Sequence, residues 1–172
     1  MLYKLKRMTE LELFAKEMVN EGNTTRKMLA IVPADKFDWK PHPKSMSIRQ
    51  LTAHIAELPG WAGMVLHTDE LDFAKMDYKP THFDTTAQLM EVFEKTLADG
   101  VQQLANGDES TLQQPWTLRN GEQVYSTEPK ADVIRMSFSQ IIHHRAQLGV
   151  FLRLLDIPIP GSYGPSADDT SF

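Results

Sequence analysis

Apolar residues recur every three or four positions along most of the chain, with polar and charged residues between them. This spacing is typical of an amphipathic helix, which packs one face on a core and exposes the other to water. The pattern predicts four long helices, which span about residues 9–32, 48–68, 85–105 and 129–156.

Local start and stop signals support these boundaries. A hydroxyl residue followed three positions later by a glutamate or glutamine is a capping box, which satisfies backbone N–H groups at a helix start. Three such pairs precede apolar stripes: Thr9 with Glu12, Ser47 with Gln50, and Thr85 with Gln88. Within the second helix, Pro59 and Gly60 predict a kink or an interruption, because proline lacks the N–H that a helix needs.

The segments between the helices have different patterns. Residues 69–83 are acidic and show little periodicity, which predicts a surface loop. Between the third and fourth helices, Asn120 and Gly121 are a preferred pair for a two-residue turn, and the residues around them alternate as in strands. The prediction is an all-α four-helix bundle with a small β-hairpin between helices three and four. An extended tail, residues 157–172, follows the last helix.

Composition narrows the class of protein. A chain of 172 residues with 41% hydrophobic residues suits a single domain, residues 1–172, with its own core. The net charge of −5 argues against sequence-independent nucleic-acid binding, and no stretch has the length and apolarity of a membrane helix. The expected location is the cytoplasm. The chain has no cysteine, so any thiol chemistry requires a thiol from outside.

Candidate chemistry gathers on the last predicted helix. Gln140 and His144 are four positions apart and share a helix face, whereas His143 is rotated about a quarter turn from them. His54 lies on the apolar stripe of the second predicted helix. A single histidine on such a stripe is most often a hydrogen-bonded core residue, but two inward-facing imidazoles favour a metal site. Spacing alone leaves both interpretations open.

These same residues carry a resemblance to a known family. The run His143-His144-Arg145-Ala146-Gln147-Leu148, with the later Tyr163-Gly164-Pro165-Ser166, resembles the last helix and tail of the DinB/YfiT-like superfamily. The run Leu51-Thr52-Ala53-His54-Ile55-Ala56-Glu57 resembles its second helix. The resemblance implies an up-down-down-up four-helix bundle, a homodimer, and three histidines that bind nickel or zinc at one end of the bundle.

Carried over to this chain, the metal ligands are His54, Gln140 and His144, so that glutamine stands where the family pattern has a histidine. A glutamine oxygen carries no charge and is a weak ligand for nickel or zinc. Three outcomes follow from this departure: a weak site completed by water, a site that recruits another residue, or a vestigial pocket without metal. Glu57, His143 and Arg145 are further candidates to orient a metal ligand or to bind the substrate.

Two classes of function follow from the resemblance. The first is a metal-dependent hydrolase or a transferase that uses an external low-molecular-weight thiol, acting on a small-molecule substrate. The second is a non-catalytic small-molecule-binding or stress-associated protein whose metal site is weakened. His54 and His144 favour the first class, and Gln140 favours the second.

Overall fold

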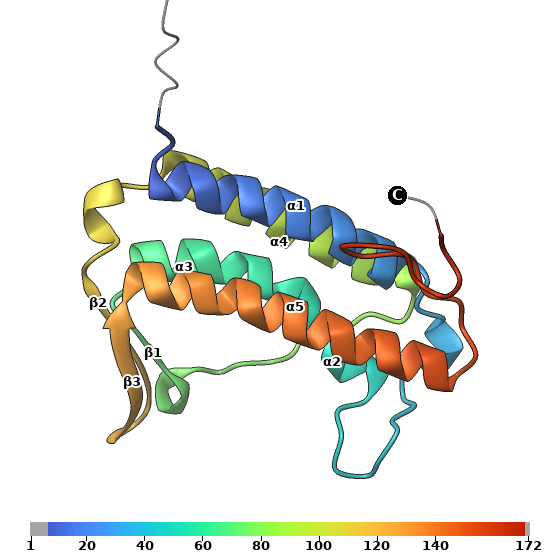
Figure 1. The fold of residues 1–172 in the computed structure, drawn as a ribbon. Helices are drawn as coiled ribbons and strands as arrows, with labels where there is room; N and C mark the ends of the chain where they lie inside the picture. The colour runs from blue at the N-terminus through green and yellow to red at the C-terminus, as the bar shows by residue number, and fades with distance from the viewer. Residues whose placement is uncertain (1–6, 171–172) are drawn as a thin grey trace, which may run out of the picture.

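The computed structural model describes residues 7–170 and is mostly helical, as the hydrophobic pattern predicts (Figure 1). Its helices are α1 (Glu10–Ala30), α2 (Ile48–Glu57), α3 (Trp61–His67), α4 (Thr86–Asn106) and α5 (Lys130–Leu154). In Figure 1, α1 and α4 lie side by side in one layer, and α2, α3 and α5 form the layer beneath them. The up-down-down-up order implied by the family resemblance stays a prediction.

Helix starts are the best-predicted feature of the chain. Thr9, Ser47 and Thr85 each accept a hydrogen bond from the backbone N–H three residues later, and the glutamate or glutamine at that position accepts one from the cap residue. All three predicted capping boxes are therefore confirmed. Because these caps fix where α1, α2 and α4 begin, they also fix which residues of each helix face the core.

The second predicted helix is interrupted at the expected place. A short 3₁₀ helix, η2 (Leu58–Gly60), separates α2 from α3 at Pro59. Gly100 of α4 packs directly against Pro59, and a Cβ atom at Gly100 would collide with the Pro59 carbonyl oxygen. The interruption thus lets α4 approach η2 closely, and it turns the chain just after His54 and Glu57, two of the candidate site residues.

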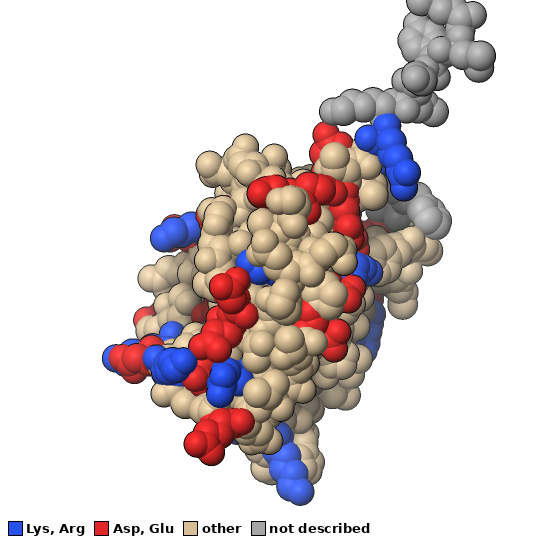
Figure 2. Space-filling view, turned by 90° about the vertical axis from the view of Figure 1, so that its left-hand side faces the viewer, with Lys and Arg blue, Asp and Glu red and all other residues tan. Residues whose placement is uncertain are grey.

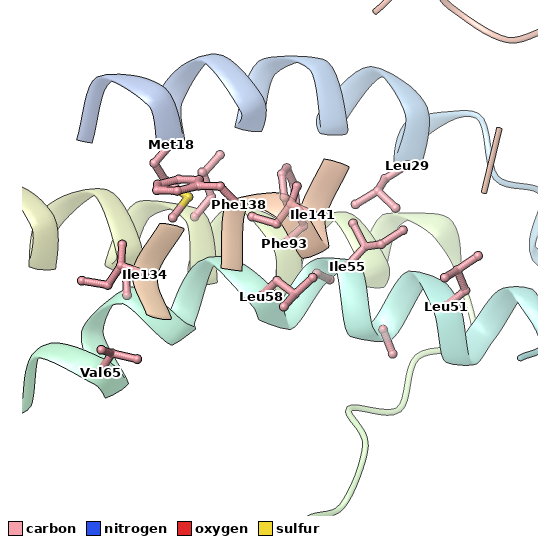
Figure 3. Packing of buried hydrophobic residues seen from close by; sticks show 14 of the residues in the cluster. Met18, Leu29, Leu51, Ile55, Leu58, Val65, Phe93, Ile134, Phe138 and Ile141 are labelled. Atoms are coloured by element: carbon pink, nitrogen blue, oxygen red, sulfur yellow. The ribbon is translucent and has the colours of Figure 1, made fainter. Parts of the chain in front are cut away.

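Large apolar side chains from both layers meet in one core (Figure 3). Met18 of α1, Ile55 of α2, Phe93 of α4 and Phe138 of α5 all have no exposed surface. Phe138 packs against Phe14 of α1, with a distance of 5.8 Å between the ring centroids. Burial of these residues holds α2 and α5 in a fixed relative position, so the polar residues at their shared edge are also held in place.

A small sheet lies at one end of the bundle. Its strands are β1 (Glu70–Asp72), β2 (Pro115–Asn120) and β3 (Gln123–Pro129), in the order β1-β2-β3. β2 and β3 are antiparallel, and β1 pairs in parallel with β2. The prediction of a loop throughout residues 69–83 is therefore wrong at β1. The turn is also shifted by one residue, because Asn120 pairs with Gln123 and leaves Gly121, with a φ of 59°, as its first residue.

Charged groups at the sheet end are mixed in sign. Figure 2 looks at this end of the molecule and shows basic and acidic side chains next to one another. Near β1, Lys75 donates to Glu70 at 2.9 Å, and Arg119 lies 3.7 Å from the same carboxylate. Asp72 accepts from the Gly121 N–H at 2.8 Å, which ties β1 to the turn of the hairpin.

The tail after α5 turns back along the bundle toward α1 (Figure 1). Arg153 of α5 donates to Asp168 of the tail at 3.2 Å, and Ser166 donates to the Ile159 carbonyl oxygen at 2.6 Å. The last two residues of the predicted tail lie outside the described residues. Over residues 7–170, every helix is too short or too polar to cross a membrane.

Candidate functional site

His54 and His144 lie against each other where α2 and α5 meet. Their ring centroids are 4.7 Å apart and the ring planes are inclined at 76°, an edge-to-face contact. Ile55 beside His54 and Leu148 one turn after His144 are fully buried, so the core packing of both helices orients the two imidazoles. Both histidines are half-buried. The structure therefore brings together two of the three residues expected to bind metal.

The surroundings of His54 favour a neutral imidazole. Burial lowers its pKa below the ordinary value of 6.5, and the neighbouring His144 lowers it further, while the carboxylate of Glu57 acts in the opposite direction. A neutral imidazole has a free nitrogen lone pair, which is the form that binds a metal ion or accepts a hydrogen bond. His54 is thus available as a ligand at neutral pH.

Gln147 holds His144 and His143 in one orientation. Its side-chain oxygen lies 3.0 Å from Nδ1 of His144, and its nitrogen lies 3.0 Å from Nε2 of His143. An amide oxygen can only accept, so this contact favours the tautomer of a neutral His144 ring in which Nδ1 carries the hydrogen and Nε2 has the lone pair. A hydrogen bond of this kind fixes the orientation of an imidazole and raises its basicity as a metal ligand. Sequence reasoning missed Gln147, although its position three and four residues after the histidines was a usable signal.

Gln140 and His54 line the same pocket, which has a volume of about 370 Å³. The pocket lies between α2, α3, α5 and the sheet. Most of its wall is apolar, and its polar residues are concentrated around His54. Its lining consists of His54, Glu57, Leu58, Trp61, Met64, Leu71, Phe73, Met76, Tyr78, Leu118, Met136 and Gln140.

Glu57 is engaged with the segment that covers this pocket. Its carboxylate accepts hydrogen bonds from the Tyr78 hydroxyl at 2.7 Å, the Thr81 N–H at 3.0 Å and the Thr81 hydroxyl at 2.7 Å. Burial, together with the nearby Glu57 carboxylate, raises the pKa of Tyr78 to about 12. Glu57 therefore has a structural role in holding this segment, and its expected role in orienting a metal ligand or binding the substrate stays a prediction.

Arg145 belongs to a different part of the molecule. Its side chain is buried and donates to Glu21 at 2.7 Å, to Thr25 at 3.0 Å and to the Tyr163 hydroxyl at 2.6 Å. The Tyr163 hydroxyl in turn donates to Glu21 at 2.7 Å. These partners lie on α1 and the tail, so Arg145 has a structural role in joining them, and its expected part in substrate binding stays a prediction. His143 is exposed, and its hydrogen bond is to Gln147.

The donor set fits a nickel or zinc ion only as a weak site. Within residues 7–170, no group of three or more histidine, cysteine, aspartate or glutamate side chains is placed to hold a metal. His54 and His144 supply two neutral nitrogen donors, and the Gln140 oxygen is the nearest match to the third family ligand. Three protein donors with an open position are typical of catalytic zinc, but this set lacks a third imidazole or a carboxylate.

Comparison with known proteins identifies the family. The model of the DinB family matches residues 1–170, and the chain therefore belongs to the DinB family, which confirms the resemblance seen in the sequence. No curated protein matches the sequence.

Solved structures share the fold. A DinB-like protein from Bacillus subtilis has a TM-score of 0.69 at 17% identity and covers 87% of this chain and 96% of its own. A member of the family from Exiguobacterium sibiricum has a TM-score of 0.65 at 18% identity, covering 90% and 97%. A mycothiol-dependent maleylpyruvate isomerase has a TM-score of 0.58 at 14% identity, covering 83% of this chain and 64% of its own. At these identities the likeness establishes the fold alone.

Proposed function

We propose that His54 and His144, with the Gln140 oxygen as a weaker third donor, bind a nickel or zinc ion beside a pocket for a small-molecule substrate. The observation that carries the proposal is the edge-to-face contact of the two imidazoles, with ring centroids 4.7 Å apart, in which His54 also lines an apolar pocket. The proposed reaction is hydrolysis of the substrate or transfer of an external low-molecular-weight thiol to it.

The chain's own residues prepare this site. Burial lowers the pKa of His54 and so favours its neutral form, and the Gln147 oxygen beside Nδ1 of His144 favours the tautomer with a lone pair on Nε2. The apolar wall formed by residues such as Leu58 and Met136 excludes water from the substrate. When bound, a divalent ion lowers the pKa of a coordinated water or thiol and so supplies a nucleophile near neutral pH.

The thiol version of the proposal draws on two observations. The chain contains no cysteine, so a reacting thiol has to be a separate molecule. One of the structures with a similar fold is a mycothiol-dependent maleylpyruvate isomerase, and this likeness supports a reaction with a small thiol. A homodimer and a cytoplasmic location also stay predictions from the sequence.

A specific observation favours the second candidate, a small-molecule-binding protein without catalysis. Gln140 replaces the third family histidine, and Glu57, the carboxylate nearest in sequence to His54, is occupied by Tyr78 and Thr81. A site with two strong donors holds metal loosely, and a binding function needs only the pocket and its polar end.

Isothermal titration of Ni²⁺ and Zn²⁺ into protein prepared without a histidine tag tests the metal site. The proposal predicts one binding event per chain, which His54→Ala and His144→Ala each abolish and which the exposed-loop control His42→Ala leaves unchanged. Equal binding by wild type and both site variants would contradict it. Reaction of glutathione with 1-chloro-2,4-dinitrobenzene, followed with and without metal, then separates the thiol transferase from the non-catalytic alternative.

A further inference from the structure

The pocket lined by His54 has a mostly apolar wall with no lysine or arginine side chain. Of its twelve lining residues, eight are apolar and none is lysine or arginine. Its volume of about 370 Å³ lies within the range of pockets that bind small molecules. The apolar members are Leu58, Trp61, Met64, Leu71, Phe73, Met76, Leu118 and Met136. The wall therefore provides shape and apolar contact, without a positive charge from the protein.

The one charged side chain in the lining has the sign that repels an anion. Glu57 carries a carboxylate, and its hydrogen bonds to Tyr78 and Thr81 come from neutral donors. In the metal-free protein, an anionic ligand would lose its hydration in this pocket and gain no counter-charge from the lining side chains, which is costly. The remaining polar groups, His54 and Gln140, can donate or accept a hydrogen bond without charge.

Several large apolar side chains on the pocket wall still face solvent. Phe73 is 45% exposed, Met76 is 40% exposed and Tyr78 is 53% exposed. All three lie within or just before the segment of residues 76–82, here called the strap, which runs from the sheet end toward the start of α4. An apolar ligand in the pocket would cover this surface, and the hydrophobic effect would favour that contact.

The strap is attached to the bundle through one residue. Within the described part of the chain, its hydrogen bonds to the helices all end on the Glu57 carboxylate, from Tyr78 and Thr81. On the C-terminal side, Phe83 is buried and packs on Phe37, with ring centroids 5.1 Å apart. Glu57 therefore positions the outer wall of the pocket, and Tyr78 contributes both a hydrogen bond and a ring to that wall.

We propose that this pocket binds a neutral, mainly apolar small molecule whose single polar group lies at the end of the pocket lined by His54 and Gln140, under a strap that Glu57 holds in place. The inference deepens the proposed function by naming its substrate class and rests on it for the role of the site. The pocket itself, however, exists without a metal ion, so ligand binding is measured separately from metal binding.

Two fluorescent probes with one carbon skeleton test the ligand class. N-phenyl-1-naphthylamine is neutral, and 8-anilinonaphthalene-1-sulfonate is the same molecule with an added sulfonate. In buffer with EDTA, the neutral probe is expected to bind at least about tenfold more tightly than the sulfonate, which corresponds to ~1.4 kcal/mol. Equal affinity, tighter binding of the sulfonate, or no binding of the neutral probe would overturn the proposal.

Substitutions on one helix locate the binding. Met136→Lys adds a positive charge inside the pocket and is expected to weaken the neutral probe at least about tenfold while strengthening the sulfonate. Val150→Lys makes a similar change on an exposed position of α5 outside this pocket and is expected to change neither affinity. If both variants bound the neutral probe as tightly as wild type, the probe would bind outside this pocket and the assignment would be refuted.

The strap has a milder variant of its own. Tyr78→Phe keeps the ring in the pocket wall but removes the hydrogen bond to Glu57, and is expected to weaken the neutral probe about two- to tenfold. Unchanged affinity would refute the role of the strap. Circular dichroism of each variant verifies folding. Wild-type protein that binds the neutral probe but fails to bind Ni²⁺ would refute the metal proposal and leave the pocket assignment standing.

Discussion

His144 and Arg145 are neighbours on α5, yet they belong to two regions with opposite character. Arg145 is 3% exposed and donates to Glu21, Thr25 and Tyr163, all within the chain. His144 is half-buried, touches His54 edge-on, and within residues 7–170 its ring has one hydrogen bond, to Gln147. The first region is a polar network whose members pair with one another. In the second, one ring nitrogen of His144 has no hydrogen-bond partner among the described residues.

This difference shows how a buried polar residue with a structural role is distinguished from one in a candidate binding site. Successive residues on a helix are about 100° apart, so Arg145 reaches α1 and the tail while His144 reaches α2. A buried charge is tolerated when it is paired and hydrogen-bonded, and Arg145 meets that condition through Glu21, Thr25 and Tyr163. A polar side chain that lines a pocket and has an unpaired donor or acceptor, as His144 has among the described residues, is expected in a binding site.

The largest expected effect comes from breaking the network around Arg145. Arg145→Met leaves the Glu21 carboxylate buried without its ion pair and is expected to lower the free energy of unfolding by about 3–5 kcal/mol. Urea unfolding measures the change. The matched control is Arg135→Met. It removes an exposed ion pair between the same two helices, in which Arg135 lies 3.0 Å from Glu17, and should lower the free energy of unfolding by only about 0–1 kcal/mol. Similar losses in the two variants would remove the distinction.

The site region should respond in affinity rather than in stability. Gln140→His restores the third imidazole of the family pattern and is expected to tighten Ni²⁺ binding at least about tenfold, or ~1.4 kcal/mol. Isothermal titration measures this gain. Leu154→His, which adds a histidine at an exposed position of α5 with no other histidine one turn away, is the control. If Gln140→His gained no more than this control while remaining folded, Gln140 would not be at the metal.

A smaller effect is expected where the tail joins the network. Tyr163→Phe removes the hydroxyl that lies between Arg145 and Glu21 and should lower the free energy of unfolding by about 1 kcal/mol. Tyr125→Phe, on an exposed position of β3, is the control and should be close to neutral. Thermal unfolding compares the two. A change in Ni²⁺ affinity in Tyr163→Phe would show that the two regions are coupled, contrary to this account.

The smallest effect concerns the protonation of His54 in metal-free protein. Its pKa in the folded state is below the ordinary 6.5, mainly because of burial and then because of His144. The unfolded chain therefore binds more protons, so the stability that His54 contributes is present above about pH 6.5 and is lost as pH falls toward the lowered pKa. NMR titration in EDTA should show this pKa, and His144→Gln should raise it in part. A pKa of 6.5 or higher in wild type would contradict the assigned environment.

Local sequence signals predicted the parts of the fold that depend on local chemistry. The caps at Thr9, Ser47 and Thr85 and the break at Pro59 are encoded within a few residues of where they act. Strand β1 is different, because its three residues form a strand only by pairing with β2, which lies more than 40 residues away. A short acidic stretch of this kind carries no signal of its own.

The candidate site divides in the same way. The helical spacing of His54 and His144 within apolar stripes placed both rings on inward faces, and the structure brings the two rings together. The partners of Glu57 and Arg145 were not predictable, because Thr81 and Tyr163 approach them only through the path of the strap and of the tail. Residue type and spacing indicate what a side chain can do, whereas the tertiary partners decide whether it is free to do it.

The central claim is that ring nitrogens of His54 and His144 bind a metal ion. Paramagnetic broadening of the histidine side-chain resonances by substoichiometric Ni²⁺ tests this most directly, because it reports all the histidines in one NMR experiment on unmodified protein. The account predicts that the signals of His54 and His144 broaden first, with those of the adjacent His143 next, while His42, His67 and His82 stay sharp. Broadening that begins at His42, His67 or His82, or that reaches all six histidines together, would contradict it.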